Sequence, residues 1–207
     1  MTSLTPRTVH HLPDNYQEVD FLHLTSTKNI LWLNVASFVP LVIAGVLLWV
    51  WMIFYHGILG APLATDWPRG GISIVMGLFL MLGMVVLHEL LHGLAITYYG
   101  HQAHYGMKLH KGVVYATAEG SLFWRNQYIG VCLAPLIGIT LLVLLGSLFV
   151  SQTLGLWLML VGAMNAAGAI GDLWMVKFAL RYPPSTLIRD EADGMRIFTP
   201  QSAPTPL

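Results

Sequence analysis

The sequence predicts an all-α membrane protein with four transmembrane helices and a short cytoplasmic-side β-hairpin between helices 2 and 3. Of its 207 residues, 56% are hydrophobic and only 10% are charged, whereas soluble domains carry about 25% charged residues. The mean hydropathy is +0.66. Four apolar runs are each long enough to cross a bilayer, which takes about 20 residues. We therefore expect the lipid bilayer to surround most of the chain.

The four apolar runs define the expected spans. Tryptophans near the ends of the first run are typical of membrane interfaces, and the third run contains Pro135. Gly100 follows the second run and is expected to cap its C-terminus. The runs cover residues 30–55, 71–99, 128–150 and 154–180.

The segment 101–127, between the second and third runs, is too polar to cross a membrane. Within it, Met107–His110 and Val113–Thr117 predict two short strands on either side of Lys111-Gly112, a dipeptide suited to a tight turn. A hairpin at the edge of the membrane is therefore expected here.

The two ends of the chain are polar. We expect residues 1–29 to lie at the membrane surface and residues 181–207 to form a loose tail, flanking a membrane domain at 30–180. With four spans, both ends and the hairpin share one side, and Arg69 alone among the basic residues lies on the other. The basic residues on the shared side are Arg7, Lys28, Lys108, Lys111, Arg125, Lys177, Arg181, Arg189 and Arg196. The positive-inside rule then places both termini in the cytoplasm, and we expect the plasma (inner) membrane of a prokaryote.

The second run contains candidate metal-binding and catalytic residues in the stretch His88-Glu89-Leu90-Leu91-His92-Gly93. On a helix, His88 and His92 lie one turn apart on one face, so both imidazoles can reach a single metal ion. Glu89 lies beside them and can accept a proton from a water held by that metal. An acidic residue deep in a membrane costs about 2.5–3.5 kcal/mol on insertion scales, which favours a functional role. The motif is the HExxH arrangement of zinc hydrolases.

A third metal ligand is expected in the fourth run, where Asp172 is an acid in an otherwise uncharged stretch. The rise from residue 71 to His88 is about 25 Å and that from residue 154 to Asp172 about 27 Å, so the two reach similar depth. Asn165 lies two turns earlier on the same helical face. It can donate to a substrate carbonyl or oxyanion, or it can form a hydrogen bond between helices.

Other residues compete for these roles. Some zinc proteases use a downstream glutamate, which makes Glu119 an alternative ligand. Three histidines of the polar segment are further alternatives, although solvated loop histidines are common. Two tyrosines in the same segment are candidates for assisting a transition state, without support from their spacing. These residues are His101, His104 and His110, and Tyr105 and Tyr115.

Composition and charge bear on the other functional classes to which the protein could belong. The formal net charge of zero does not favour nucleic-acid binding. The single cysteine, Cys132, lies in an apolar run and is expected to be a buried hydrophobic residue. The alternative to an enzyme is a non-catalytic metal-binding membrane protein, a zinc sensor or transporter component. The almost wholly apolar stretch before His88 does not favour a transport path across the bilayer.

Together these residues resemble the zincin peptidase family of small membrane proteins often labelled DUF3267. The resemblance rests on the HExxH stretch, the polar hairpin, residues 128–135, and Asn165 through Asp172, and it covers about residues 13–180. The chain is also similar, more distantly, to the site-2 protease class of intramembrane metalloproteases, although Asp172 stands in Gly-Asp-Leu where that class has Leu-Asp-Gly. The resemblance implies one zinc ion held by His88, His92 and Asp172.

The resemblance further implies that Glu89 is the general acid and base of peptide hydrolysis, with peptides or membrane proteins as substrates. A membrane-embedded helix must be unwound locally before its carbonyls can react, because it hides them in its own hydrogen bonds. A strand of the 107–117 hairpin could hold the extended substrate by strand addition. The sequence leaves the oligomeric state open.

Overall fold

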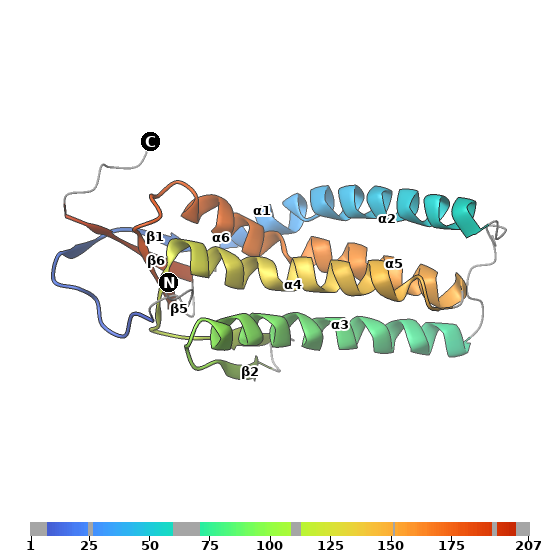
Figure 1. Cartoon of the computed structure of the whole chain (residues 1–207), viewed down its shortest axis with the longest axis horizontal. Helices are drawn as coiled ribbons and strands as arrows, with labels where there is room; N and C mark the ends of the chain where they lie inside the picture. Colours follow the sequence, from blue (N-terminus) through green and yellow to red (C-terminus); the bar gives the residue numbers. More distant parts are fainter. Residues whose placement is uncertain are drawn as a thin grey trace, which may run out of the picture. The chain divides into compact units, whose positions relative to one another are not determined.

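The structure is a computed structural model that describes residues 8–24, 27–59, 71–108, 113–150, 152–191 and 194–201, most of them helical. The elements in chain order are β1 (Tyr16–His23), α1 (Thr27–Ala36), α2 (Phe38–Leu59), α3 (Gly71–Tyr98), β2 (His104–Lys108), β3 (Val113–Thr117), β4 (Leu122–Trp124), α4 (Arg125–Gly146), α5 (Gln152–Gly168), α6 (Ile170–Ala179), β5 (Leu187–Glu191) and β6 (Gly194–Pro200) (Figure 1).

Among the described residues, three helical stretches are long and apolar enough to cross a membrane: Asn29–Ile58, Ile74–Tyr98 and Arg125–Gly146. They coincide within a few residues with the first three predicted runs. The predicted fourth run is not one continuous helix, because α5 ends at Gly168 and α6 begins at Ile170. Gly168 and Gly171 flank this break, and glycine is a poor helix former. The count of spans is four only if this bent pair is taken as one span.

The chain divides into two compact units. Unit 1 comprises Met1–Leu33, Glu89–Ala134 and Gly171–Leu207, and unit 2 comprises Asn34–His88 and Pro135–Ile170. Both α3 and α4 contribute to both units. The division of the chain into a membrane domain at 30–180 with polar ends stays a prediction.

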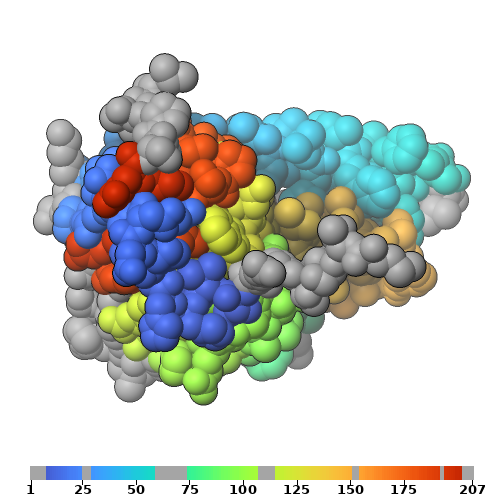
Figure 2. Space-filling model, turned by 60° about the vertical axis from the view of Figure 1, so that its left-hand side comes forward, coloured from blue at the N-terminus to red at the C-terminus, as the bar shows by residue number. Residues whose placement is uncertain are grey.

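Unit 1 contains a four-stranded antiparallel sheet in the order β1-β6-β5-β4 (Figure 1). Its first and last described strands pair from Tyr16 opposite Pro200 to His23 opposite Gly194. In Figure 2 the blue N-terminal residues accordingly lie against the red C-terminal strands. The expectation of a loose tail after residue 180 is therefore wrong for β5 and β6. Apolar side chains that are almost fully buried stabilise these strands: Leu187, Ile188, Met195 and Ile197.

Unit 1 also contains two antiparallel strands in the polar segment between α3 and α4, where the sequence predicts a hairpin. Strands β2 and β3 pair in antiparallel register from His104 opposite Thr117 to Lys108 opposite Val113. The second predicted strand has the bounds of β3, whereas β2 begins three residues before the first predicted strand. The turn predicted at Lys111-Gly112 lies outside the described residues, as do Arg7, Arg69 and His110.

Gly100 ends α3 as the sequence predicts. Its φ of +85° lies in the left-handed region that favours glycine. The N–H of Gly100 donates to the carbonyl of Thr97, and the N–H of His101 donates to the carbonyl of Ile96. These bonds satisfy carbonyls that would otherwise lack donors at the helix end. The cap turns the chain away from α3 toward the hairpin.

Unit 2 contains helices with largely apolar surfaces. Helix α2 packs along α5 (Figure 1). At the far end of α2, Trp51 Nε1 donates to Ser147 Oγ at 3.1 Å and the Tyr55 hydroxyl donates to the carbonyl of Leu148 at 3.0 Å. Many large apolar side chains of α2 and α3 point outward and are exposed, as expected of helices that face lipid.

Candidate metal centre

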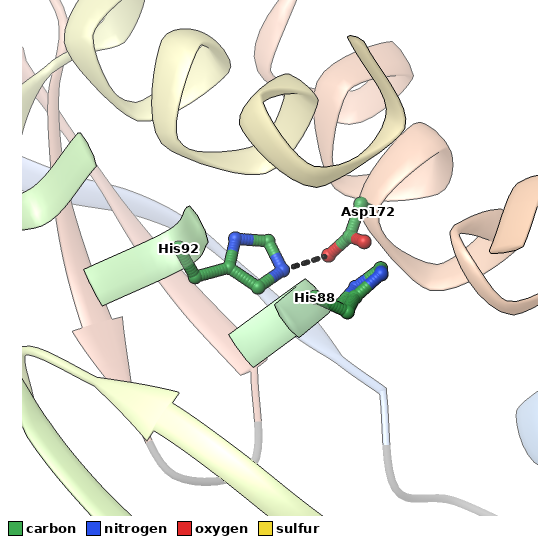
Figure 3. Close-up of side chains that lie close together, drawn as sticks. All are labelled: His88, His92 and Asp172. Atoms are coloured by element: carbon green, nitrogen blue, oxygen red, sulfur yellow. Dashed lines mark ion pairs between the residues drawn. The ribbon is translucent and has the colours of Figure 1, made fainter. Parts of the chain in front are cut away.

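Potential metal-ligand atoms of three residues, two on α3 and one on α6, lie close together (Figure 3). His88 and His92 lie one turn apart on the continuous helix α3, and Asp172 lies in the first turn of α6. One ligand atom from each of the three lies within 4.8 Å of the others. The two predicted histidines and the predicted aspartate thus form one cluster.

Asp172 is a nearly buried carboxylate, 8% exposed. Its Oδ1 lies 3.5 Å from Nε2 of His92 (Figure 3). The break before α6 places Asp172 in a first helical turn, where the helix dipole favours negative charge. The interruption of the fourth run therefore places the aspartate where its charge is stabilised.

The ring of His92 is fixed by the main chain of α4. Its Nδ1 lies 3.0 Å from the carbonyl oxygen of Val131. A carbonyl can only accept, so Nδ1 carries the proton and donates. The other ring nitrogen, Nε2, then presents its lone pair toward Asp172. This is the tautomer that binds a metal through Nε2.

The ring of His88 is fixed in the same way by a side chain of α5. Its Nδ1 lies 2.9 Å from Oδ1 of Asn165, which accepts. Asn165 is fully buried, and its Nδ2 donates to the carbonyl of Pro135 at 3.4 Å. Both ends of this amide are thus engaged within the protein, and Nε2 of His88 keeps its lone pair.

This donor set fits a zinc ion. Two imidazole nitrogens and one carboxylate oxygen are common zinc ligands, and catalytic sites with three protein ligands leave a fourth position for water or substrate. Metal-binding histidines usually donate their second ring N–H to a carbonyl or carboxylate, which orients the ring. His88 and His92 both do so, to an amide oxygen and to a backbone carbonyl.

Glu89 is held by the hairpin. Its Oε2 accepts a hydrogen bond of 2.7 Å from the backbone N–H of Ala116, a residue of β3. Because this N–H donates to Glu89, it is directed away from the paired strand β2. The edge of β3 that does not pair with β2 therefore lies beside Glu89.

The competing residues are not members of the cluster, which was identified among the described residues. Glu119 is exposed in the turn after β3, and His104 is exposed on β2. His101 is buried against Phe123, with ring centroids 4.2 Å apart. The hydroxyl of Tyr105 lies against Gly93, the residue after His92, so closely that a Cβ at Gly93 would overlap it.

Sequence reasoning missed a buried carboxylate of β5, Asp190. It accepts hydrogen bonds from the Thr117 hydroxyl at 2.6 Å, the Ala118 N–H at 3.1 Å and the Tyr128 hydroxyl at 3.1 Å. Burial raises the pKa of Asp190, and these donors oppose the increase. Asp190 thereby fixes the end of β3, next to Ala116. No motif marks it, because Asp190 belongs to a polar segment in which acids are ordinary.

The described residues thus combine helices long and apolar enough to cross a membrane with a histidine–histidine–aspartate cluster whose atoms are close enough together to hold a metal ion. Residues 81–187 match the model of the family DUF3267, described as "Putative zincin peptidase". The match covers more than half of the chain, and the chain belongs to this family. No curated protein and no solved structure matches the chain.

Proposed function

We propose that the chain is a zinc-dependent, membrane-embedded peptidase that hydrolyses peptide bonds of membrane or juxtamembrane substrates. The observation that carries this proposal is the convergence of His88, His92 and Asp172 with both histidines in the metal-binding tautomer. Membership of the zincin peptidase family supports hydrolysis over a sensor or a transporter component.

Each side chain has a defined task in this proposal. A bound zinc ion supplies Lewis-acid chemistry that acidifies water and polarises a peptide carbonyl. His88, His92 and Asp172 hold the ion. Glu89 accepts the proton of the attacking water and passes it to the leaving amine. It adjoins His88 in the sequence, and the Ala116 N–H orients its carboxylate.

We assign Asn165 a positioning role in place of a contact to the oxyanion. A donor to the oxyanion must have an N–H directed at the reacting carbonyl. The Nδ2 of Asn165 is directed at the carbonyl of Pro135, and its Oδ1 holds His88. Asn165 therefore acts on the reaction through the orientation of His88.

The edge of β3 that does not pair with β2 is the proposed binding site for an extended substrate; there the Ala116 N–H donates to Glu89 and the Ala118 N–H at its end donates to Asp190. A strand paired along this edge runs beside Glu89, because Ala116 belongs to both the edge and the Glu89 contact. Backbone pairing binds any unwound sequence, and side-chain contacts then select among sequences. This places the cleaved bond next to the general base.

We further propose that the bent pair α5–α6 forms a fourth span, so that both termini and the hairpin share the cytoplasmic side of a prokaryotic inner membrane. The distribution of basic residues supports this arrangement. The metal cluster then lies near the cytoplasmic end of α3, and the substrates are membrane proteins or peptides reached from that side.

Comparing membrane proteomes from cells that carry the wild-type protein or Glu89→Gln tests the function. We expect substrates to be cleaved only by the wild type, while purified Glu89→Gln retains its zinc. Glu119→Gln, at an exposed glutamate, is the matched control and should cleave normally. Equal cleavage by Glu89→Gln would remove Glu89 as the base. A zinc-bound wild type that yields no cleavage products would support the sensor or transporter alternative.

A further inference from the structure

Pro135 lies inside α4, four residues after Val131, whose carbonyl binds the ring of His92. Its side chain is almost fully buried, and it is the proline within the helix Arg125–Gly146. A proline in a helix interior has no N–H, so the carbonyl four residues earlier loses its usual donor, which destabilises the helix. A buried proline at this position therefore calls for an explanation.

The carbonyl that loses its donor is that of Val131. This is the same carbonyl that accepts the Nδ1–H of His92 at 3.0 Å. In an unbroken helix, the N–H of residue 135 would compete for this oxygen. Pro135 removes that competitor, so that the imidazole of His92 satisfies the carbonyl.

The carbonyl of Pro135 itself serves the other histidine. It accepts from Nδ2 of Asn165 at 3.4 Å, and Oδ1 of the same amide accepts from Nδ1 of His88 at 2.9 Å. Since the amide oxygen and nitrogen look alike in shape, the contact at Nδ2 decides which end faces His88. The Pro135 carbonyl therefore directs the accepting oxygen toward the ring.

We propose that Pro135 is a positioning residue that sets the tautomer of both imidazoles: through its missing N–H for His92, and through its carbonyl and Asn165 for His88. Both Nε2 atoms are thereby prepared for a metal before it arrives. The proposal rests on the zinc site of the proposed function, and it concerns how this chain preorganises that site.

Pro135→Ala restores the N–H and tests the first branch. The restored N–H competes with the Nδ1–H of His92 for the Val131 carbonyl. Because this carbonyl has two lone pairs, both donors can bind, and the hydrogen bond from His92 is weakened and redirected. We expect zinc to bind about 10- to 100-fold more weakly, the usual effect of losing a partner of a ligand histidine. Pro40→Ala is the matched control, since Pro40 lies in the first turn of α2, where no intrahelical donor is required. Its zinc affinity should equal that of the wild type.

The second readout is the nitrogen-15 NMR spectrum of the histidine rings in the metal-free, full-length protein. We expect both His88 and His92 of the wild type to carry the proton on Nδ1, and His92 of Pro135→Ala to shift toward the Nε2–H form. Wild-type zinc affinity in Pro135→Ala, or a weaker affinity with unchanged tautomers, would overturn the proposal.

The NMR spectrum of the metal-free wild type tests the proposed role of Pro135 even if Pro135→Ala does not fold. A proton on Nε2 of His92 in that protein would refute the role of Pro135, whatever the variant does. A wild type that binds no zinc while both rings carry the Nδ1 proton would instead refute the zinc peptidase and leave the role of Pro135 standing.

Discussion

Up to Leu87, helix α3 presents apolar side chains outward, with Leu78, Phe79 and Leu82 exposed by 66%, 74% and 64%. From His88 onward the same helix makes directed polar contacts to α5, β3 and α4. Leu94 and Tyr98 of the second half are exposed as well, by 63% and 77%, so the two halves differ in these hydrogen bonds at particular atoms and not in their apolar surface.

This difference predicts two classes of variant. In the first half of α3, substitutions that keep volume and apolarity should change the free energy of unfolding and little else. In the second half, small changes should alter metal binding or turnover while the protein stays folded, because site geometry tolerates only small displacements. The four predictions below run from the largest expected effect to the smallest; the glycine pair tests this division within α3, and the others compare a site residue with residues outside the site.

Asp172→Ala should have the largest effect. It removes the carboxylate 3.5 Å from His92 Nε2, leaving two protein ligands where a catalytic zinc site normally has three. Zinc affinity should fall by more than about 100-fold, beyond the 10- to 100-fold loss typical of outer partners. Elemental analysis of purified protein measures this, with Glu119→Ala as the control. An unchanged zinc content would exclude Asp172 as a ligand.

Two glycines of α3 compare its halves directly. A Cβ at Gly93 would overlap the Tyr105 hydroxyl, whereas a Cβ at Gly83 meets nothing within 4 Å. Gly93→Ala should displace Tyr105 and lower kcat/KM about 10- to 100-fold, the effect of a shift of about 1 Å at a reacting site. Gly83→Ala should leave kcat/KM unchanged. Equal effects in a peptidase assay would contradict the division of the helix.

The same contrast explains which features were predictable from the sequence. The HExxH stretch was recognisable because helical periodicity is local, and Asp172 because an isolated acid stands out in an apolar run. The four-stranded sheet was not predicted, since β1 and β6 pair across almost the whole chain. β4 has only three residues, and the burial of β6 does not alternate regularly. Non-local pairing leaves little local signal.

Pro135 and Asp190 show a second reason why some features could not be predicted from the sequence. Helix geometry alone predicts that the Val131 carbonyl lacks its usual donor, but it cannot say that His92 supplies one. The Asp190 carboxylate binds Thr117, Ala118 and Tyr128, partners brought together only by the folded sheet and hairpin. Positioning residues of this kind act on the site through others, so their sequence neighbours do not reveal them.

Ser147→Ala should have a small effect that is confined to stability. It removes the acceptor of the Trp51 Nε1–H, a hydrogen bond within unit 2 that involves none of the proposed site residues. Because hydrogen bonds between membrane helices are worth about 0.6 kcal/mol on average, we expect a loss of about 1 kcal/mol or less. Thermal unfolding in detergent measures this, and zinc affinity should be unchanged. A loss of zinc would show that the Trp51–Ser147 hydrogen bond influences the site.

His101 should give the smallest effect, and it contrasts with His92 as a buried histidine outside the cluster. Burial, followed by the charge of His10, lowers the pKa of His101 below its ordinary value. The folded protein therefore favours the neutral ring. As the pH falls through about 6.5, the unfolded chain binds a proton before the folded one does, so stability should decrease toward the folded-state pKa.

His101→Phe removes this titrating ring. No hydrogen bond is lost at Nε2, which has no partner among the described residues, and the new ring can still pack on Phe123. The melting temperature of the metal-free wild type should fall more steeply between pH 8 and pH 5 than that of the variant. Metal-free protein is required, because zinc binding is itself pH-dependent. If the melting temperatures of the wild type and the variant fall equally with pH, His101 is not the group that binds the proton. A difference seen only with zinc bound would assign it to the ligand histidines.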